Sequence, residues 1–406
     1  MQAHNTFNWV KGGVTAPSGF RASGIKAGIK SNKKDMALIV SDCPAKAAGV
    51  FTLNQVKAAP VMLCRKRLQN KPSAQAIIVN SGNANACTGR QGLADAEAMA
   101  ALTAGLLPIN PALALVCSTG TIGLSLPMKK IQAGINLAVR SLSRRGGNEA
   151  AAAIMTTDTR AKQAAVRFQL NGKKVTIGAM AKGAGMIAPN MATLLVFITT
   201  DAAIEAGPLQ TALSEAVEAS FNRILVDGDQ STNDTVLCLA NGLAGNKAIV
   251  KGRPEMELFQ AALTAVCQKL AHLIVADGEG VTKVVNIMVK GAKGAGDAEK
   301  VARAIARSLL VKTSWFGADP NWGRVICAVG YSGANVVPGK ICIYYNGQAA
   351  VINGKSSGLQ ADKLKKIISG KEFSIEVNLC LGRGSYSMLT CDCSLDYVKI
   401  NADYMT

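Results

Sequence analysis

The segment KGAGMIAPNMATLLVFITTDA, residues 182–202, joins a glycine-rich turn to a strand-like apolar run. Its glycines and Pro189 favour a tight turn, and residues 194–200 are apolar or β-branched, which predicts a strand. Thr193 stands where the turn ends and the strand begins. The segment therefore predicts a single hydroxyl held at the start of a sheet strand.

The chain on either side alternates between strand and helix patterns. From residue 282 onward strands dominate, with a hairpin at Asn346-Gly347. The predicted fold class is α/β, with layers of sheets and helices. Strands are predicted over residues 37–41, 75–80, 112–117, 164–170 and 174–179, and helices over residues 93–107, over residues 130–142, around Leu209 to Phe221 and from Pro254.

Composition limits the classes of protein to which the chain can belong. With 406 residues, 49% of them hydrophobic and 17% charged, it is long enough to bury a large core. The uncharged residues 98–128 exceed a membrane span but are interrupted by prolines, and the N-terminus lacks a secretory signal pattern. We predict no membrane segment and a cytoplasmic protein.

The chain is strongly basic, with a formal net charge of +19. The basic residues are dispersed and few aromatic side chains lie among them to stack on bases, which argues against a nucleic-acid partner. The charge instead favours small anionic substrates, although its size has no explanation in the sequence.

Common metal and cofactor sites do not fit the sequence. His4 and His272 are the only histidines, and the eleven cysteines lack the spacing of a zinc site. Asp227-Gly228-Asp229 lacks the rest of a calcium loop, and Gly354-Lys355-Ser356 lacks the first glycine of a phosphate loop. The loose dinucleotide pattern at residues 183–188 is followed by a strand, whereas that motif opens a helix. No metal and no cofactor are predicted.

With only two histidines, a histidine base is not expected, and a nucleophile whose own amine acts as the base fits the sequence better. In a strained turn, the Thr193 hydroxyl attacks the carbonyl of Ala192, and water then opens the resulting ester. The new N-terminal threonine has an amine with an ordinary pKa of about 8, which can accept the hydroxyl proton. From these residues alone, a plain turn before a strand remains the alternative.

The segment at residues 181–201 closely resembles the self-cleavage segment of the ornithine acetyltransferases, also called bifunctional glutamate N-acetyltransferases, of arginine biosynthesis. Further blocks that resemble this family follow in order along the chain. They are GVTAPSGFRASGIKAGIK (13–30), NSGNANACTG (80–89), CSTGTIG (117–123), IMTTDT (154–159), VDGDQSTNDT (226–235), VADGEGVTK (275–283), FGADPNWGR (316–324) and INADYMT (400–406).

The resemblance implies a fold, an assembly and a reaction. The fold is a four-layered α/β sandwich similar in architecture to N-terminal-nucleophile hydrolases but differently connected. A precursor is cut between Ala192 and Thr193 into an α chain, 1–192, and a β chain, 193–406, which pair as an α2β2 heterotetramer. Thr193 takes the acetyl group from N2-acetylornithine and passes it to glutamate, and acetyl-CoA is a further donor in the bifunctional members.

The resemblance also implies roles for individual residues. Thr119 and Gly120 form the oxyanion hole, a lysine suits the substrate α-carboxylate, and Glu279 suits the ornithine ammonium. This chain departs from the usual family residue at Leu194, Gln230 and Val281, none of which is a catalytic group. The implied substrate-binding residues are Thr156, Lys182, Thr193, Glu279, Asn401 and Thr406.

Two other functions are alternatives to the acetyltransferase reaction. A self-cleaving aminopeptidase would keep the threonine nucleophile but give the acyl group to water, so glutamate would not accelerate deacetylation. A non-enzymatic binding protein would run as an intact 42.1 kDa chain on a denaturing gel.

Overall fold

The strand predicted after the opening segment is present as β8, Leu195–Thr200, and every residue in it is buried. It pairs antiparallel with β7, Lys173–Lys182, and parallel with β9, Thr235–Ala240. In this computed structural model, which describes residues 7–188 and 194–403, β8 is therefore an interior strand of its sheet. An apolar run buried on both faces explains this central position.

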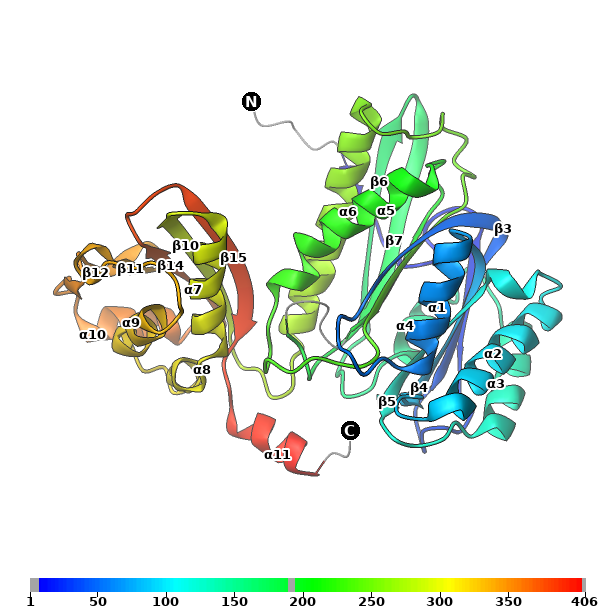
Figure 1. The fold of residues 1–406 in the computed structure, drawn as a ribbon, viewed down its shortest axis with the longest axis horizontal. Helices are drawn as coiled ribbons and strands as arrows, with labels where there is room; N and C mark the ends of the chain where they lie inside the picture. The colour runs from blue at the N-terminus through cyan, green and yellow to red at the C-terminus, as the bar shows by residue number, and fades with distance from the viewer. Residues whose placement is uncertain (1–6, 189–193, 404–406) are drawn as a thin grey trace. The chain divides into compact units, whose positions relative to one another are not determined.

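The described chain divides into two spatial units (Figure 1). Unit 1 holds described residues 7–188, 194–222 and 229–274, and unit 2 holds residues 223–228 and 275–403. The predicted chains 1–192 and 193–406 are a covalent division that this spatial division does not test. Ala192 and Thr193 lie outside the described residues.

Unit 1 is built on a nine-stranded sheet, counted over the described residues. The paired order is β1-β6-β7-β8-β9-β3-β4-β5, with β2 also on β3. Its remaining strands are β1 Phe7–Trp9, β2 Phe20–Ile25, β3 Met36–Phe51, β4 Ser73–Asn83, β5 Ala114–Thr121 and β6 Lys162–Leu170.

The long strand β3 divides this sheet into two halves. Its first part pairs with β2 and β4, its second part pairs with β9, and the register shifts between Val40 and Ala45. Ile39 and Leu115 from one half share a buried core cluster with Phe197 and Leu237 from the other half. The two halves therefore pack face to face as the inner layers of a sandwich.

Helices cover the two outer faces of the sandwich (Figure 1). Alternate residues of the first half, such as Leu38 and Val116, pack with α2, Gly89–Leu106, and α3, Met128–Arg140. On the other side, Gln210 of α5, Ala206–Glu218, bonds to both backbone groups of Gly49 in β3. The helix α6, Pro254–Val275, lies alongside α5, and Gln260 Nε2 of α6 donates to Ala212 O of α5. The predicted layered α/β class is confirmed.

Two shorter helices complete unit 1, namely α1, Ala59–Asn70, and α4, Gly147–Ala153. The predicted helices correspond to α2, α3, α5 and α6, and the predicted strands to β3 to β7. The strand expected over residues 112–117 begins later, at Ala114, because Pro111–Leu113 forms a 3-10 helix capped by the Asn110 side chain.

By length and composition alone, α6 is the one described helix that could span a membrane. Half of its apolar window, 50%, is buried inside the structure, as in the core helix of a globular unit.

Unit 2 has a six-stranded sheet among its described residues, with order β13-β12-β11-β14-β10-β15. The hairpin predicted at Asn346-Gly347 is confirmed as β11 and β12. The expectation that strands dominate was incomplete, because amphipathic helices supply much of the buried core. The elements are β10 Val284–Ala292, α7 Ala295–Arg307, α8 Leu309–Phe316, α9 Trp322–Gly330, β11 Cys342–Tyr345, β12 Gln348–Ile352, β13 Lys355–Ser356, α10 Ala361–Ile368, β14 Glu372–Asn378, β15 Gly384–Cys391 and α11 Leu395–Asp403.

Candidate active site

The predicted oxyanion residues Thr119 and Gly120 lie at the end of β5, beside its parallel partner β4. Gly120 has a φ of +130°, and a Cβ there would lie only 2.4 Å from the carbonyl carbon of Gly82. Only glycine fits this position without displacing backbone. The close approach fixes the turn that carries the Thr119 hydroxyl and the Gly120 N–H.

A buried network of hydrogen-bonded side chains holds this turn in place. The Asn233 Nδ2 group donates to Ser118 O and to Ala84 O, each at 2.7 Å. The Ser118 hydroxyl donates to Asn80 Oδ1 at 2.6 Å, and Asn80 Nδ2 donates to Asn83 O at 2.8 Å. Because Ser118 O belongs to the peptide that precedes Thr119, the network orients that peptide.

Lys182, the last residue of β7, is brought to the same place. Its ammonium donates to the Thr119 hydroxyl oxygen at 3.4 Å, and its side chain is buried. A hydroxyl that accepts a bond from an ammonium group keeps its own proton for donation. The predicted oxyanion residue and a predicted substrate-binding lysine are therefore neighbours.

Asp158, to which no role was assigned from the sequence, lies between Lys182 and Thr156. Its Oδ1 accepts bonds from the Lys162 ammonium at 2.6 Å and from Gly183 N–H at 2.8 Å, and its Oδ2 accepts from Thr156 N–H at 3.0 Å. Burial alone would raise the pKa of Asp158, but the charges of Lys182 and Lys162 outweigh it and hold this pKa below its usual value. The carboxylate is therefore ionised and fixes this turn.

Lys30 is a second residue of this site to which no role was assigned from the sequence. Its stem packs over Gly82, since a Cβ at Gly82 would lie 2.8 Å from Lys30 Cγ, and its ammonium donates to Met155 O at 2.8 Å. Burial is the largest influence on the pKa of Lys30 and lowers it to about 8, against the opposing charge of Asp35. The carboxylate of Asp35 also accepts the backbone N–H groups of Ala27, Ile29 and Lys30, which holds this loop in place.

In unit 2, the predicted residues Glu279 and Asn401 are in contact. Asn401 Nδ2 of α11 donates to Glu279 Oε2 at 2.9 Å and to Tyr397 O at 3.0 Å. Glu279 is buried, whereas Asn401 is exposed. The bond orients one carboxylate oxygen of Glu279.

The remaining predicted residues, Ala192, Thr193 and Thr406, lie outside the described residues. Leu194 is described, and its N–H donates to Asp234 Oδ1 at 2.9 Å. Over residues 7–188 and 194–403, no group of three or more His, Cys, Asp or Glu side chains is placed to hold a metal ion.

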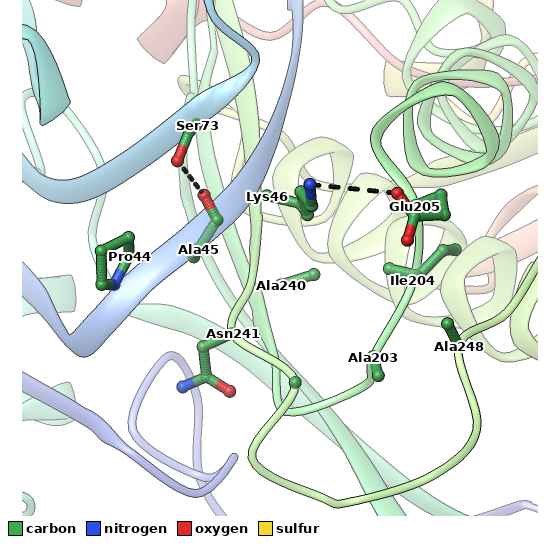
Figure 2. A pocket seen from close by; sticks show the side chains of 11 residues that line it. Pro44, Ala45, Lys46, Ser73, Ala203, Ile204, Glu205, Ala240, Asn241 and Ala248 are labelled. Carbon is green, nitrogen blue, oxygen red and sulfur yellow. Dashed lines mark hydrogen bonds and ion pairs between the residues drawn. The ribbon is translucent and has the colours of Figure 1, made fainter.

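A pocket of about 330 Å³ lies elsewhere on unit 1 (Figure 2). Its wall includes Lys46 and Glu205, whose charged groups are 3.9 Å apart, and Ala240 at the end of β9. Because β9 runs from Thr235, beside Leu195, to Ala240, beside Thr200, the pocket lies at the opposite end of the strands from Leu194. None of the predicted site residues lines it.

Comparison with known proteins gives matches along almost the whole chain. A model of the ArgJ family matches residues 21–406. The arginine biosynthesis bifunctional protein ArgJ of Symbiobacterium thermophilum is 51% identical over 401 residues, which cover 98% of this chain and 100% of that protein. The protein of the same name from Bacillus subtilis is 45% identical over 397 residues, covering 98% and 97%. A solved ornithine acetyltransferase from Mycobacterium tuberculosis, complexed with ornithine, is 45% identical, covers 47% of this chain and 100% of that chain, and has a TM-score of 0.43.

Proposed function

Because the chain belongs to the ArgJ family, we propose that it is an acetyltransferase of arginine biosynthesis that moves the acetyl group of N2-acetylornithine to glutamate. The observation that carries this proposal is the contact between Lys182 and Thr119 beside Gly120. It puts a cation for a substrate carboxylate next to hydrogen-bond donors suited to an oxyanion. Both substrates carry an α-carboxylate, so one cation serves both half-reactions.

Self-cleavage comes first in the proposed sequence of steps. The Thr193 hydroxyl oxygen bonds to the carbonyl carbon of Ala192, the C–N bond between the two residues breaks, and the hydroxyl proton passes to the nitrogen. Water then hydrolyses the ester, which leaves a carboxylate on Ala192 and restores the hydroxyl of Thr193. The products are the chains 1–192 and 193–406.

Acetyl transfer follows on the exposed threonine. The Thr193 hydroxyl attacks the acetyl carbonyl of N2-acetylornithine while its amine accepts the proton. The tetrahedral oxyanion accepts bonds from the Thr119 hydroxyl and the Gly120 N–H, and ornithine leaves with the returned proton. The glutamate amine then attacks the acetyl ester, and N-acetylglutamate leaves in a second step of the same kind.

The charged groups around the turn have different proposed roles. Lys182 and Lys30 attract the substrate carboxylate, and Asp158 holds Lys182 and the Thr156 backbone in place without contacting substrate. Glu279, Asn401 and Thr406 keep the substrate-binding roles that the family resemblance implies, and these roles remain predictions. The α2β2 assembly and the cytoplasmic location also remain predictions.

The decisive experiment is a paired test of scission and turnover. Purified protein is analysed by denaturing gel and mass spectrometry, and then incubated with N2-acetylornithine and labelled glutamate. We expect two chains, the second beginning at Thr193, and labelled N-acetylglutamate, whereas Thr193→Ala gives neither. An intact wild-type chain, or full turnover by Thr193→Ala, contradicts the proposal.

The same preparation separates related activities. N2-acetylornithine alone should acetylate Thr193, and added glutamate should accelerate its deacetylation; deacetylation at an unchanged rate would indicate transfer to water. Glutamate and acetyl-CoA without N2-acetylornithine should yield N-acetylglutamate if this chain is bifunctional, as its named relatives are.

A further inference from the structure

Two consecutive residues, Asn233 and Asp234, connect the oxyanion turn to the start of β8. They directly precede β9, which lies between β8 and β3 in the sheet. Asn233 holds the peptide before Thr119 through its bond to Ser118 O at 2.7 Å. Asp234 holds Leu194 N–H through its Oδ1 at 2.9 Å. Adjacent side chains thus fix two parts of the chain that come from different halves of the sandwich.

Asp234 is deeply buried, with 1% of its surface exposed. Its second carboxyl oxygen, Oδ2, is also buried and accepts no hydrogen bond of normal geometry among the described residues, although the Thr52 hydroxyl lies close enough to lower the pKa of the side chain. The backbone on both sides is fixed as well, because Thr235 N–H donates to Leu194 O at 3.1 Å and Thr52 N–H donates to Asp234 O at 3.0 Å. Burying an acidic side chain with one oxygen unpartnered lowers the free energy of unfolding, so an uncompensated residue of this kind suggests a functional role.

A second buried aspartate, directly after the other end of β8, offers a comparison. Asp201 is also buried, but both of its carboxyl oxygens are satisfied, by Thr176 N–H at 2.7 Å and Ser18 N–H at 2.9 Å. Asp201 therefore has an ordinary structural role. Asp234 differs because only one of its carboxyl oxygens accepts a hydrogen bond of normal geometry. It lies beside Leu194, at the start of β8.

Burial is the main influence on the ionisation of Asp234 and raises its pKa well above the usual value, against the Leu194 N–H bond, the charge of Lys182 and the Thr52 hydroxyl. Burial therefore favours the neutral, protonated form of this side chain. A neutral acid keeps one oxygen as an acceptor for Leu194 N–H and has one O–H to donate.

We propose that Asp234 is the positioning residue for self-cleavage: by holding Leu194 N–H it fixes the peptide unit after residue 193 relative to the turn that Asn233 orients. This inference rests on the proposed function, because it requires the cut before Thr193. The residue acts through the backbone and takes no part in bond making or breaking.

The test measures the rate of scission of newly made full-length chain. Labelled precursor is produced by cell-free translation, and the appearance of two chains is followed on a denaturing gel. Asp234→Leu keeps the branching at Cγ and removes the acceptor, whereas Asp234→Asn keeps an acceptor oxygen for Leu194 N–H. Asp201→Asn is the matched control at the other end of the strand. The unfolding midpoint of each product is measured in parallel, and Asp234→Ala replaces Asp234→Leu if the latter does not fold.

We expect Asp234→Leu to slow scission at least about tenfold, which corresponds to misplacing a reacting group by a fraction of an ångström. Asp234→Asn should cleave within about threefold of wild type, because one neutral acceptor hydrogen bond is retained. Asp201→Asn should cleave at the wild-type rate even if its unfolding midpoint falls. This separation of rate from stability is what a purely structural role cannot produce.

Every other outcome contradicts the positioning role of Asp234. If wild type is cut and Asp234→Leu is cut equally fast, the positioning role is wrong while the proposed function stands. If Asp234→Asn and Asp201→Asn are both slowed as much as Asp234→Leu, the effect is general destabilisation and the role is again wrong. If wild type remains whole, the proposed function and this inference fail together.

Discussion

The ammonium of Lys182 lies 3.4 Å from the hydroxyl oxygen of Thr119, although their strands are five steps apart in the sheet order. In a flat sheet, five steps at about 4.8 Å each would separate them by roughly 24 Å. The fold closes this distance because the second part of β3 turns the sheet back on itself. The contact therefore depends on the sandwich, and it gives the hydroxyl a cationic partner.

The Thr119 hydroxyl should be a transition-state group. Thr119→Val is expected to lower kcat about 100-fold, equivalent to about 3 kcal/mol, with little change in KM, because an oxyanion donor acts on the tetrahedral intermediate. Steady-state kinetics with N2-acetylornithine and glutamate measures this. Thr211→Val, on the exposed face of α5, is the matched control and should leave kcat unchanged. A rise in KM alone would contradict the assignment.

Gly120 should tolerate no side chain. Gly120→Ala would put a Cβ 2.4 Å from the Gly82 backbone at a φ of +130°. We expect a loss of at least about 2 kcal/mol in unfolding free energy, from strain and overpacking together. Gly123→Ala is the control, because it also has a positive φ, +85°, but nothing lies within 4 Å of its Cβ. Urea unfolding should show the smaller loss for the control; equal losses would mean that the close approach has no cost.

Lys30 should make substrate binding depend on pH. Since burial lowers the pKa of Lys30 to about 8, its positive charge is present below that pH and is lost as pH rises through it. We expect KM for glutamate to rise through pH 8 in wild type. In Lys30→Met, KM should be raised at neutral pH by about fivefold or less, because a partly exposed charge is screened, and the step near pH 8 should be absent. Lys26→Met, at an exposed position of the same loop, should keep the wild-type profile.

Asp158 should contribute to stability as well as to the geometry of the site. Asp158→Asn leaves the Lys162 ammonium buried without its carboxylate, and we expect a loss of about 3 kcal/mol. Because the pKa of Asp158 is lowered on folding, its contribution is present above the unfolded pKa and is lost as pH falls toward the folded one. Urea unfolding as a function of pH measures this. Asp396→Asn, which removes an exposed ion pair with Lys399, should change little.

Asp234 should have the opposite effect on stability. Its folded pKa is raised, so the folded state binds the extra proton and stability falls as pH rises from the unfolded pKa toward the folded one. Asp234→Asn lacks this proton and should gain stability relative to wild type as pH rises above the unfolded pKa of an aspartate. Thermal unfolding of the two proteins at each pH provides the comparison, and parallel curves would show that Asp234 is not a neutral acid.

Sequence patterns predicted the layers better than the contacts between them. The apolar run after Thr193 gave β8, and the helical periods gave α2, α3, α5 and α6, because these signals are local. In unit 2, α7 was not predicted, although its buried residues Ala298, Val301, Ala302, Ile305 and Ala306 repeat at helical spacing and the signal was therefore present in the sequence.

The candidate site shows the same division between local and distant information. Motif resemblance indicated Thr119, Gly120, Thr156 and Lys182, which the structure gathers in unit 1. The roles of Asp158, Lys30 and Asp234 depend on contacts with residues 25 to 125 positions away in the chain. Their motifs were visible in the sequence, but a buried carboxylate is recognised only once its neighbours are placed.

The pairing of β7 with β8 has a consequence for any chain cut between them. Residues 177–182 and 195–200 are joined rung by rung, so scission before residue 193 would turn every one of these intrachain bonds into a bond between separate polypeptides. The two pieces would share one hydrophobic interior and elute as a single particle from a sizing column. Only a denaturant would reveal that the backbone had been broken.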